Sequence, residues 1–291
     1  MKRVGVAGLG LMGSGIARRL AGTGCDVMVY NRTASKTAGF SRVAASPKEL
    51  ADSCDLVITV VTDYSAVEQV MLGDSGIVQS KNRQLLVADA STISPSQSAR
   101  CAQALRQGAG IEMLGMPVMG GPAAAESGEL VPMVAGNRQA FERARPIIEK
   151  LGSQVFYIGE KDGFANAVKL ALNLNIALIA IAVSEGITLV RGAGIDPAVF
   201  VKVLNSTYFR TGLSEKKGPK MVQNNFEPSF HLKNMLKDVE LATGTAQQAG
   251  IALPVTALAQ QMFRAASNSG LSEYDYTAIC AFLARMNGLE K

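Results

Sequence analysis

One lysine and two asparagines form a polar stripe in an otherwise apolar stretch of the sequence. Asn166, Lys169 and Asn173 follow one another at intervals of three and four residues, so a helix would carry them on one face. A lysine that is removed from water can act as a general acid or base. The alternative is a lysine at a helix end whose stem packs on apolar neighbours while its amine reaches water. The pattern alone does not choose between these two interpretations.

The other residues that commonly carry chemistry narrow the choice. His231 is the only histidine, which rules out a histidine-rich zinc site and nearly excludes a Ser-His-Asp triad. The cysteines are scattered without the spacing of a metal site or a disulfide framework, which favours a reducing compartment. They are Cys25, Cys54, Cys101 and Cys280. We expect no metal, and Lys169 is the candidate for proton transfer.

A glycine-rich turn near the start of the sequence is typical of dinucleotide binding. Gly8-Leu9-Gly10-Leu11-Met12-Gly13 has the spacing G-x-G-x-x-G and lies between the predicted strand Arg3–Ala7 and an amphipathic helix. The first glycine permits a tight turn, the second lets the backbone approach a pyrophosphate, and the third lets helix and strand pack closely. The start of the helix then offers N–H groups to the anion.

The end of the second predicted strand, Asp26–Tyr30, indicates which dinucleotide binds. An NAD site would carry Asp or Glu there for the ribose 2′-hydroxyl, whereas this chain has Asn31-Arg32-Thr33. Arg32 can stack on adenine and pair with a 2′-phosphate, and its two neighbours can donate hydrogen bonds. The alternative is an ordinary polar turn. We therefore predict NADP as the cofactor.

Three further segments follow predicted strands. Val61 and Thr62, at the end of the strand Asp55–Val61, are assigned to the cofactor site. Asp89-Ala90-Ser91-Thr92 lies at the carboxyl end of another strand, where open α/β sheets bind ligands. In Pro117-Val118-Met119-Gly120-Gly121-Pro122 the paired glycines can present N–H groups to a carboxylate, although a plain Gly/Pro turn is the alternative.

The pair Lys237-Asp238 lies on a predicted helix. Such a pair is ordinarily a surface ion pair.

Alternation of strand and helix patterns in the first half predicts an α/β fold. We expect an N-terminal Rossmann domain with a doubly wound parallel sheet over 1–161, followed by an all-helical C-terminal domain over 162–291. The remaining strands are predicted at Leu85–Ala88, Ile111–Leu114, Val131–Ala135 and Val155–Ile158, with antiparallel additions to the sheet allowed. Helices are predicted at Pro47–Ser53, Pro95–Gln107, Ala165–Val190, Pro197–Asn205, Phe230–Gln248, Val255–Asn268 and within 273–291.

Composition limits the classes of partner. The 291 residues have a net charge of +5 and no Trp, and no block of Lys and Arg suggests nucleic acid. The long apolar segment Ala165–Val190 contains several polar side chains, Lys169 and Glu185 among them, so we expect it to be buried rather than to cross a membrane. Burial between subunits would make the protein a homodimer or homotetramer. The first strand begins at residue 3, so we predict no signal peptide and a cytoplasmic location.

In this order the motifs resemble those of the β-hydroxyacid dehydrogenase family, which includes 3-hydroxyisobutyrate dehydrogenase and the glyoxylate/succinic semialdehyde and tartronate semialdehyde reductases. The resemblance covers essentially the whole chain. It implies that Ser91 and Thr92 lie near the nicotinamide and substrate, that Lys169 is the proton donor and that Asn173 positions the substrate. It also implies that Phe230 and Lys237-Asp238 close on the cofactor.

The substrate motif departs from the family pattern. Family members usually read Asp-Ala-Pro-Val-Ser-Gly-Gly, whereas this chain has Gly115-Met116-Pro117-Val118-Met119-Gly120-Gly121. Met119 replaces the serine that usually touches the substrate carboxylate, although the N–H groups of Gly120 and Gly121 remain. The resemblance implies an NADP-dependent enzyme that interconverts a short β-hydroxyacid and its semialdehyde or oxo-acid. An imine reductase, favoured by Met119 but disfavoured by Lys169, and a non-catalytic NADP-binding module are the alternatives.

Overall fold

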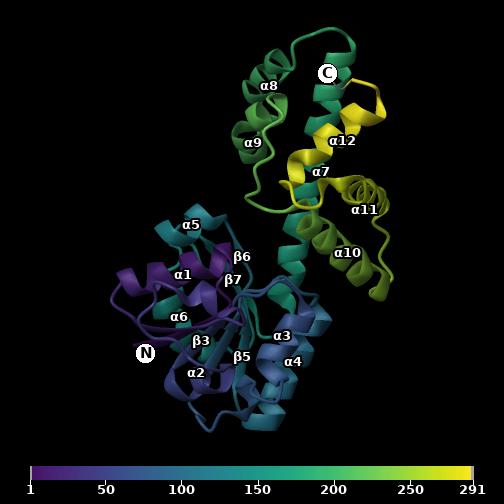
Figure 1. Cartoon of the computed structure of the whole chain (residues 1–291). Coiled ribbons are helices and arrows are strands. Elements are labelled where there is room, and N and C mark those ends of the chain that lie inside the picture. Colours follow the sequence, from purple (N-terminus) through teal and green to yellow (C-terminus); the bar gives the residue numbers. More distant parts are fainter. Residues whose placement is uncertain (1, 290–291) are drawn as a thin grey trace. The chain divides into compact units, whose positions relative to one another are not determined.

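The computed structural model describes residues 2–289, and the chain divides into two compact units. The units are Met1–Lys169 and Leu170–Lys291, and Figure 1 shows the helices and strands of both. The division between them falls inside one long helix, a few residues after the predicted boundary between residues 161 and 162. It does so because the first turns of that helix pack on the first unit while the remaining turns pack on the second.

The first unit is built on one eight-stranded sheet whose strands lie in the order β2-β1-β3-β4-β5-β7-β6, with β8 paired to β7. Strands β1 to β5 run parallel, whereas β7 is antiparallel to β5 and β6. This confirms the parallel sheet with antiparallel additions. The strands are β1 Arg3–Ala7, β2 Asp26–Tyr30, β3 Leu56–Thr59, β4 Leu86–Asp89, β5 Glu112–Gly115, β6 Val118–Met119, β7 Val131–Ala135 and β8 Phe156–Gly159.

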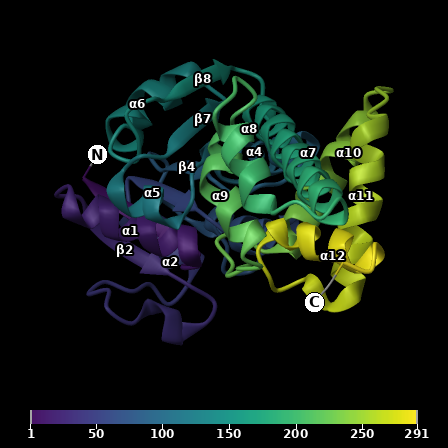
Figure 2. The ribbon, with the colours of Figure 1, turned by 90° about the horizontal axis from the view of Figure 1, so that it is seen from above.

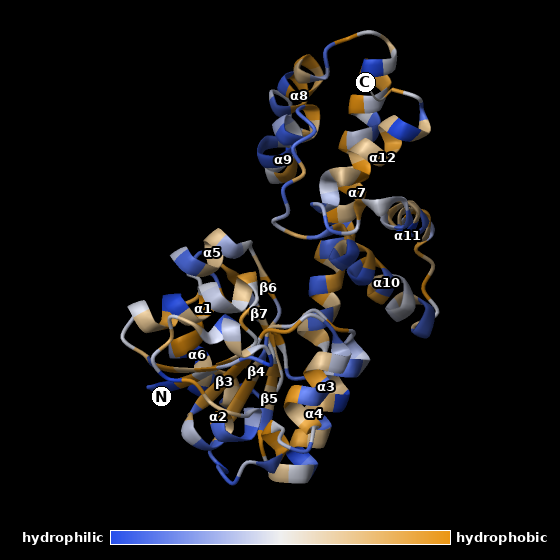
Figure 3. Ribbon diagram, in the orientation of Figure 1, coloured by the Kyte–Doolittle hydropathy of each residue, from blue (hydrophilic) through white to orange (hydrophobic). Residues whose placement is uncertain are grey.

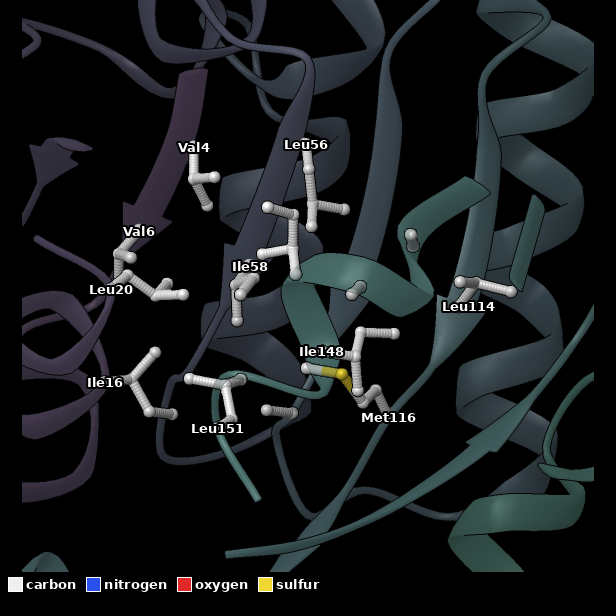
Figure 4. Packing of buried hydrophobic residues seen from close by; sticks show 14 of the residues in the cluster. Val4, Val6, Ile16, Leu20, Leu56, Ile58, Leu114, Met116, Ile148 and Leu151 are labelled. Atoms are coloured by element: carbon white, nitrogen blue, oxygen red, sulfur yellow. The ribbon is translucent and has the colours of Figure 1, made fainter. Parts of the chain in front are cut away.

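Helices cover both faces of this sheet because its central strands are apolar on both sides. In β3, Leu56 and Ile58 point into one core and Val57 into the other, as successive residues of a strand must. The first core also contains Ile16 and Leu20 of α1 (Leu11–Gly22) and Ile148 of α6 (Arg138–Ile148) (Figure 4). The second core is closed by three helices, α2 (Pro47–Ser53), α3 (Tyr64–Leu72) and α4 (Pro95–Ala109). The result is a doubly wound fold, and it confirms the predicted Rossmann architecture.

The helices of the first unit begin at residues that suit helix starts. Ser94 caps α4 through a capping box with Gln97, and Ser46 and Asp63 accept hydrogen bonds from the first turns of α2 and α3, which satisfies otherwise unpaired N–H groups. The helices are α1 Leu11–Gly22, α2 Pro47–Ser53, α3 Tyr64–Leu72, α4 Pro95–Ala109, α5 Pro122–Ser127 and α6 Arg138–Ile148, with 3₁₀ turns at Ala34–Thr37 and Ile77–Gln79.

The named elements of the second unit are all helices or helical turns within its described residues, as predicted (Figure 2). Its helices are α7 Phe164–Gly192, which begins in the first unit, α8 Pro197–Asn205, α9 Gly212–Val222, α10 Leu232–Gln248, α11 Pro254–Ala266 and α12 Ile279–Met286. A π turn occupies Ser267–Leu271 and a 3₁₀ turn Tyr276–Ala278. The α9 helix was not predicted, because Pro219 and Gly218 within it read as helix breakers.

The predicted helices Ala165–Val190 and Val255–Asn268 match α7 and α11 to within two residues at each end, and two other ranges differ for a clear reason. The predicted helix Phe230–Gln248 begins two residues later, at Leu232, because His231 has an extended backbone with ψ 144°. The terminal helix expected within 273–291 is restricted to α12, and residues 290–291 lie outside the described part of the chain. The residues before α12 instead form a 3₁₀ turn, Tyr276–Ala278, which is capped by Asp275.

Helix α7 is long and apolar enough, by length and composition alone, to cross a membrane. On the side of α7 that Figure 3 shows, hydrophobic residues alternate with hydrophilic ones. Ala177, Ala180 and Ile187 are fully buried in the core of the second unit. Only 39% of the most apolar part of α7 is buried, however, so packing within this unit accounts for part of the apolar run.

Candidate active site

The glycine-rich turn joins β1 to α1 at the carboxyl edge of the sheet. Gly8 has φ +100°, and a Cβ there would lie 2.2 Å from the carbonyl oxygen of Val60. A Cβ on Gly13 would lie 1.8 Å from the carbonyl oxygen of Gly8, whereas nothing lies within 4 Å of one on Gly10. The outer glycines are therefore required by close packing, and the middle one faces open space. This geometry fits a pyrophosphate at the start of α1, where the first N–H groups lack helical partners.

The segment after β2 is tied to this turn by a side chain. Asn31 accepts a hydrogen bond from the Leu9 N–H at 2.8 Å and donates one to the carbonyl of Thr33 at 2.9 Å. Its amide therefore fixes the distance between the glycine turn and the end of β2. Arg32 and Thr33 are exposed, so their side chains are accessible to a ligand bound along the turn.

The ends of β3 and β4 are also joined by a side chain. The Ser91 hydroxyl accepts a hydrogen bond from the Val61 N–H at 3.0 Å, and Ser91 is only 2% exposed. Thr62 is exposed and Thr92 is half-buried beside this junction. Ser91 thus joins the carboxyl ends of β3 and β4. The connections that leave the neighbouring strands β1 and β3 run to opposite faces of the sheet, and open α/β sheets bind ligands at such a point.

Asp89 is a buried carboxyl group at this edge, and the motif alone did not indicate its state. Its Oδ1 accepts hydrogen bonds from the Thr59 hydroxyl at 2.7 Å and the Ser91 N–H at 3.2 Å, while Oδ2 has no partner among the described residues. Burial raises the pKa of Asp89 to about 6, and the hydrogen bonds from Thr59 and Ser91 oppose that rise only in part.

We expect the raised pKa of Asp89 to make the unfolding free energy depend on pH. A pKa above the unfolded value of about 3.9 means that the stabilisation is complete below about pH 4 and is lost as the pH rises through 6. The unmodified protein should therefore lose roughly 1–1.5 kcal/mol between pH 5 and pH 8 through this group, and Asp89→Asn should not. Urea unfolding of both proteins at the two pH values measures the difference.

A carboxyl group with the opposite shift provides the control. Burial would raise the pKa of Asp52, but hydrogen bonds from Lys48, Ser80 and the Lys81 N–H outweigh it and lower the pKa. Asp52→Asn should therefore leave the slope between pH 5 and pH 8 unchanged, because its stabilisation is lost only at more acidic pH. Equal slopes for Asp89→Asn and the unmodified protein would contradict the assignment to Asp89.

The ammonium group of Lys169 is held by two residues of strand β6, Val118 and Met119. Nζ donates a hydrogen bond to the carbonyl of Val118 at 2.8 Å and lies 3.1 Å from the Met119 sulfur. Both acceptors belong to the segment that leads into Gly120, where φ is +119°, and Gly121. The structure therefore brings together the predicted lysine and the predicted glycine pair, with the methionine thioether, a weak acceptor, between them.

The start of α7 determines where Lys169 lies. A Cβ on Gly163 would lie 2.4 Å from the carbonyl oxygen of Pro95, and Asn166 donates a weak hydrogen bond of 3.4 Å to the carbonyl of Ile93. Asn166 is 1% exposed, so it belongs to the interior and not to a solvated stripe. The residues after β4 and the first turns of α7 are thus packed against each other, and this places Lys169 near that strand end.

Gly115 leaves room beside the side-chain oxygens of two buried residues, Asn166 and Ser98. It is the neighbour of Asp89 in the sheet, and a Cβ there would lie 2.9 Å from Asn166 Oδ1. That amide oxygen has no hydrogen-bond partner among the described residues. The usual aspartate of the family at this position would have to move Asn166. The replacement by glycine and the orientation of Asn166 are therefore linked.

In the second unit, Asn173 and Asp238 form a buried polar pair. Asn173 Nδ2 donates to Asp238 Oδ2 at 2.6 Å, and the two residues are 4% and 1% exposed. The Lys237 ammonium lies 2.8 Å from Asp238 Oδ1, as an ion pair without hydrogen-bond alignment. The interpretation of Lys237-Asp238 as a surface pair was wrong, because residues of α7 pack over the carboxylate. Asp238 instead fixes the orientation of Asn173.

The segment with Phe230 is held by a residue that the sequence analysis missed. Asp275 Oδ2 accepts from the Lys217 ammonium at 2.7 Å and from the Ser229 N–H at 3.0 Å. Burial would raise the pKa of Asp275, but these hydrogen bonds outweigh it and the pKa lies below its usual range. Asp275 thus fixes the turn that precedes α10. No local motif marks it, since its partners are 46 and 58 positions away.

Comparisons with known protein families match both parts of the chain. Residues 3–159 match the NAD-binding domain of 6-phosphogluconate dehydrogenase, and residues 163–283 match the NAD-binding domain of NADP-dependent 3-hydroxyisobutyrate dehydrogenase. Together these matches extend over nearly all of the described chain. They support a nicotinamide dinucleotide as the cofactor of the glycine-rich turn.

The similarity to individual relatives extends over nearly the whole chain. Glyoxylate/succinic semialdehyde reductase 2 of Arabidopsis thaliana is 31% identical over 95% of this chain and 78% of its own. The crystal structure of 3-hydroxyisobutyrate dehydrogenase from Salmonella typhimurium has a TM-score of 0.84 and 28% identity, over 97% of this chain and 100% of that one. The cytokine-like nuclear factor N-PAC of Mus musculus is 30% identical over 96% of this chain and half of its own length.

Proposed function

Because the chain belongs to the β-hydroxyacid dehydrogenase family, we propose that it is an NADP-dependent oxidoreductase of short β-hydroxyacids and their semialdehydes or oxo-acids. The observation that carries this proposal is the Lys169 ammonium, held 2.8 Å from the Val118 carbonyl beside the Gly120–Gly121 turn. A proton donor next to backbone N–H groups that can bind a carboxylate suits reduction of a carbonyl in a small acid.

The cofactor in this proposal is NADP. The open space at Gly10 and the start of α1 would hold its pyrophosphate, and the exposed Arg32 would pair with the 2′-phosphate with help from Thr33. Val61, Thr62 and Thr92 would line its path along the strand ends. The family resemblance assigns Phe230 and Lys237 to cofactor binding as well. When bound, the nicotinamide supplies or accepts the hydride.

In the proposed reaction the residues of this chain bind the substrate and move one proton. The N–H groups of Gly120 and Gly121 bind the substrate carboxylate. Lys169 Nζ donates a proton to the oxygen of the carbonyl as it becomes an alkoxide, and takes it back in the oxidative direction. Asn173, one helical turn further along α7 and oriented by Asp238, contacts the substrate oxygen. Thr92 completes the polar lining, and Ser91 holds the strand ends in register.

We expect Met119 to limit the use of small semialdehydes. Its thioether occupies the space next to Lys169, where a hydroxyl would bind a carboxylate more strongly. Met119→Ser should lower KM for succinic semialdehyde several-fold and leave kcat within about twofold, because one buried hydrogen bond contributes only about 1 kcal/mol. Steady-state kinetics on both proteins measures this.

Met119→Leu is the matched control for this substitution. It keeps the bulk of the side chain and removes the sulfur, so it should leave KM unchanged or raise it. A lower KM in both variants would mean that space, and not the hydroxyl, limits binding. A loss of activity with every small acid in Met119→Ser would mean that the pocket is built around a different ligand.

One panel of reactions tests the proposed function against its rivals. Glyoxylate, succinic semialdehyde and 3-hydroxyisobutyrate are assayed with NADP(H) and NAD(H), next to a cyclic imine and a reaction without substrate. Turnover of an aldehyde or hydroxyacid with the phosphorylated cofactor supports the proposal. Turnover of the imine alone supports the second candidate, which the apolar Met119 favours. Cofactor binding without turnover of any compound would indicate a non-catalytic module.

A further inference from the structure

Two buried oxygen atoms at the carboxyl end of the sheet lack a hydrogen-bond donor. They are Asp89 Oδ2 and Asn166 Oδ1, and neither has a partner among the described residues. Asp89 is fully buried and Asn166 is 1% exposed, so bulk water does not reach either side chain. A buried acceptor without a donor is costly, and two of them close together require an explanation.

The two oxygens border the same space. Thr59, Asp89 and Gly115 are in register on the adjacent strands β3, β4 and β5, so all three positions face one side of the sheet at a spacing of about 4.8 Å. Asp89 Oδ1 is turned toward β3, where the Thr59 hydroxyl donates to it at 2.7 Å. Oδ2 therefore lies on the side of β5, where Gly115 has no side chain. Asn166 Oδ1 reaches this place from α7, because it lies 2.9 Å from the position of a Cβ on Gly115.

The neighbours of Asn166 fix which way its amide points. Nδ2 donates to the carbonyl of Ile93 at 3.4 Å, and the reverse orientation would set two acceptors against each other. The Ser98 hydroxyl lies 3.2 Å from the same Cβ position, but it has one proton and two oxygens need a donor. The missing donor is therefore either a proton on Asp89 or a buried water molecule.

The surroundings of Asp89 favour the proton. Thr59 and Ser91, the groups that act on its carboxyl, are uncharged and both donate to Oδ1. Burial raises the pKa of Asp89 to about 6 in spite of these hydrogen bonds. A hydrogen bond that the neutral acid donates from Oδ2 raises it further, because such a bond favours the neutral form. An ionised Asp89 would be a fully buried charge that faces another acceptor.

Other groups on this face must be separated from Asp89 in any titration. The titratable or charged residues on the helices packed over it are Tyr64 and Glu68 of α3, Arg100 and Cys101 of α4, and Lys169 of α7. Burial raises the pKa of Tyr64 and raises that of Cys101 to about 12, so both stay protonated near neutral pH. Glu68 and Arg100 are exposed, so solvent screens their charges. Lys169 is the group that the experiment must distinguish from Asp89.

We propose that Asp89 holds a proton on Oδ2 and donates it to Asn166 Oδ1, and that this hydrogen bond positions Lys169. Asn166 lies three residues before Lys169 on α7, so the two side chains share one face of the helix. Asp89 Oδ1 also accepts from the Ser91 N–H, and Ser91 accepts from the Val61 N–H. One proton thus connects the strand ends to the helix turn that contains Lys169. The role of Lys169 rests on the proposed function, whereas the proton does not.

Infrared spectra of the full chain between pH 6 and pH 9 test the proton without a substrate. At pH 6, where exposed carboxyl groups are ionised, we expect the carbonyl stretch of a protonated carboxylic acid, which disappears as the pH rises. Asp89→Asn should lack this band. Asp52→Asn should keep it, because hydrogen bonds lower the pKa of Asp52, and Ser98→Ala should keep it as well. Asn166→Leu should shift its frequency, which depends on the hydrogen bond that the acid donates.

Turnover measures the consequence for Lys169. The kcat of Asp89→Asn should equal that of the unmodified protein at pH 5 and exceed it about three- to tenfold at pH 9, with KM unchanged. The reason is that the amide keeps a donor facing Asn166 at every pH, and one buried hydrogen bond has about this effect. A ratio is used because the titration of Lys169 itself occurs in both proteins. Asn166→Leu should have a low kcat throughout.

The outcomes separate this proposal from the proposed function. If no compound is turned over, the infrared band and the hydrogen exchange of residues 163–169 still decide it. That exchange, corrected for the intrinsic effect of pH, should quicken above the pH at which the band disappears, and should not do so in Asp89→Asn. A buried water molecule would leave Asp89 ionised and give no band. Absence of the band, or a kcat ratio that does not change with pH, would overturn the proposal, even if Asn166→Leu fails to fold.

Discussion

Lys169→Ala should lower kcat by about 10²–10⁴-fold, which is the usual contribution of a positioned general acid. Nζ donates a hydrogen bond to the Val118 carbonyl, at the edge of the proposed substrate site. The alanine variant therefore lacks the proton donor that this hydrogen bond holds in position. NADPH affinity should change little, because the glycine turn and Arg32 hold the cofactor. Turnover with the substrate that the panel identifies, next to fluorescence titration of NADPH, separates the two effects.

Two variants sharpen this test. Lys169→Arg should restore little activity, because a guanidinium does not release its proton near neutral pH. Lys81→Ala removes an exposed lysine in the turn before β4, at the opposite edge of the sheet, and should leave kcat unchanged. Near-normal turnover by Lys169→Ala would remove this lysine from the mechanism and direct attention to water or to Lys237.

Arg32→Ala should weaken NADPH binding by about 10–100-fold and barely change NADH binding. A charge-assisted contact with the 2′-phosphate contributes roughly 1.5–3 kcal/mol, and NADH offers no such phosphate. The exposed position of Arg32 after β2, with Asn31 holding the adjoining turn through Leu9, supports a role in binding and not in folding. Titration of both cofactors into both proteins gives the two ratios.

Arg143→Ala is the control for loss of a positive charge in the first unit. Arg143 is exposed on α6 and donates a hydrogen bond to the Gln84 carbonyl, so its removal should affect the two cofactors equally. Equal affinity of the unmodified protein for NADPH and NADH would contradict the predicted preference. A parallel loss of both cofactors in Arg32→Ala would instead assign the residue to the adenine or to the turn itself.

The Rossmann architecture could be predicted from local patterns because local geometry constrains it strongly. Gly8 and Gly13 are the residues that tolerate the approach of the Val60 and Gly8 carbonyls, and any side chain there would prevent the turn. The apolar run of β3 likewise indicated burial on both faces. The predicted strands were therefore correct to within one or two residues, whereas the short strand β6 was not predicted. The family resemblance followed from the same motifs.

Contacts between distant positions could not be predicted in this way. Pairing of Asn173 with Asp238 spans 65 positions, and pairing of Lys169 with Met119 spans 50. The helical stripe correctly placed the first member of each pair on one face of α7, but it contained no information about the partner. It also contained no information about the surroundings of Asn166, which is buried against the residues after β4.

The sequence by itself determined the positions of most strands and the glycine turn, because each depends on residues within a few positions of one another. Lys169 became the candidate proton donor through the family resemblance and the lack of another histidine. Only the tertiary structure decided which carboxyl groups are buried. Asp89, Asp238 and Asp275 look alike in the sequence, yet burial dominates at Asp89 and hydrogen bonds dominate at Asp275. The physical reason is that desolvation and charge pairing depend on every neighbour in space, and those neighbours are brought together only by the fold.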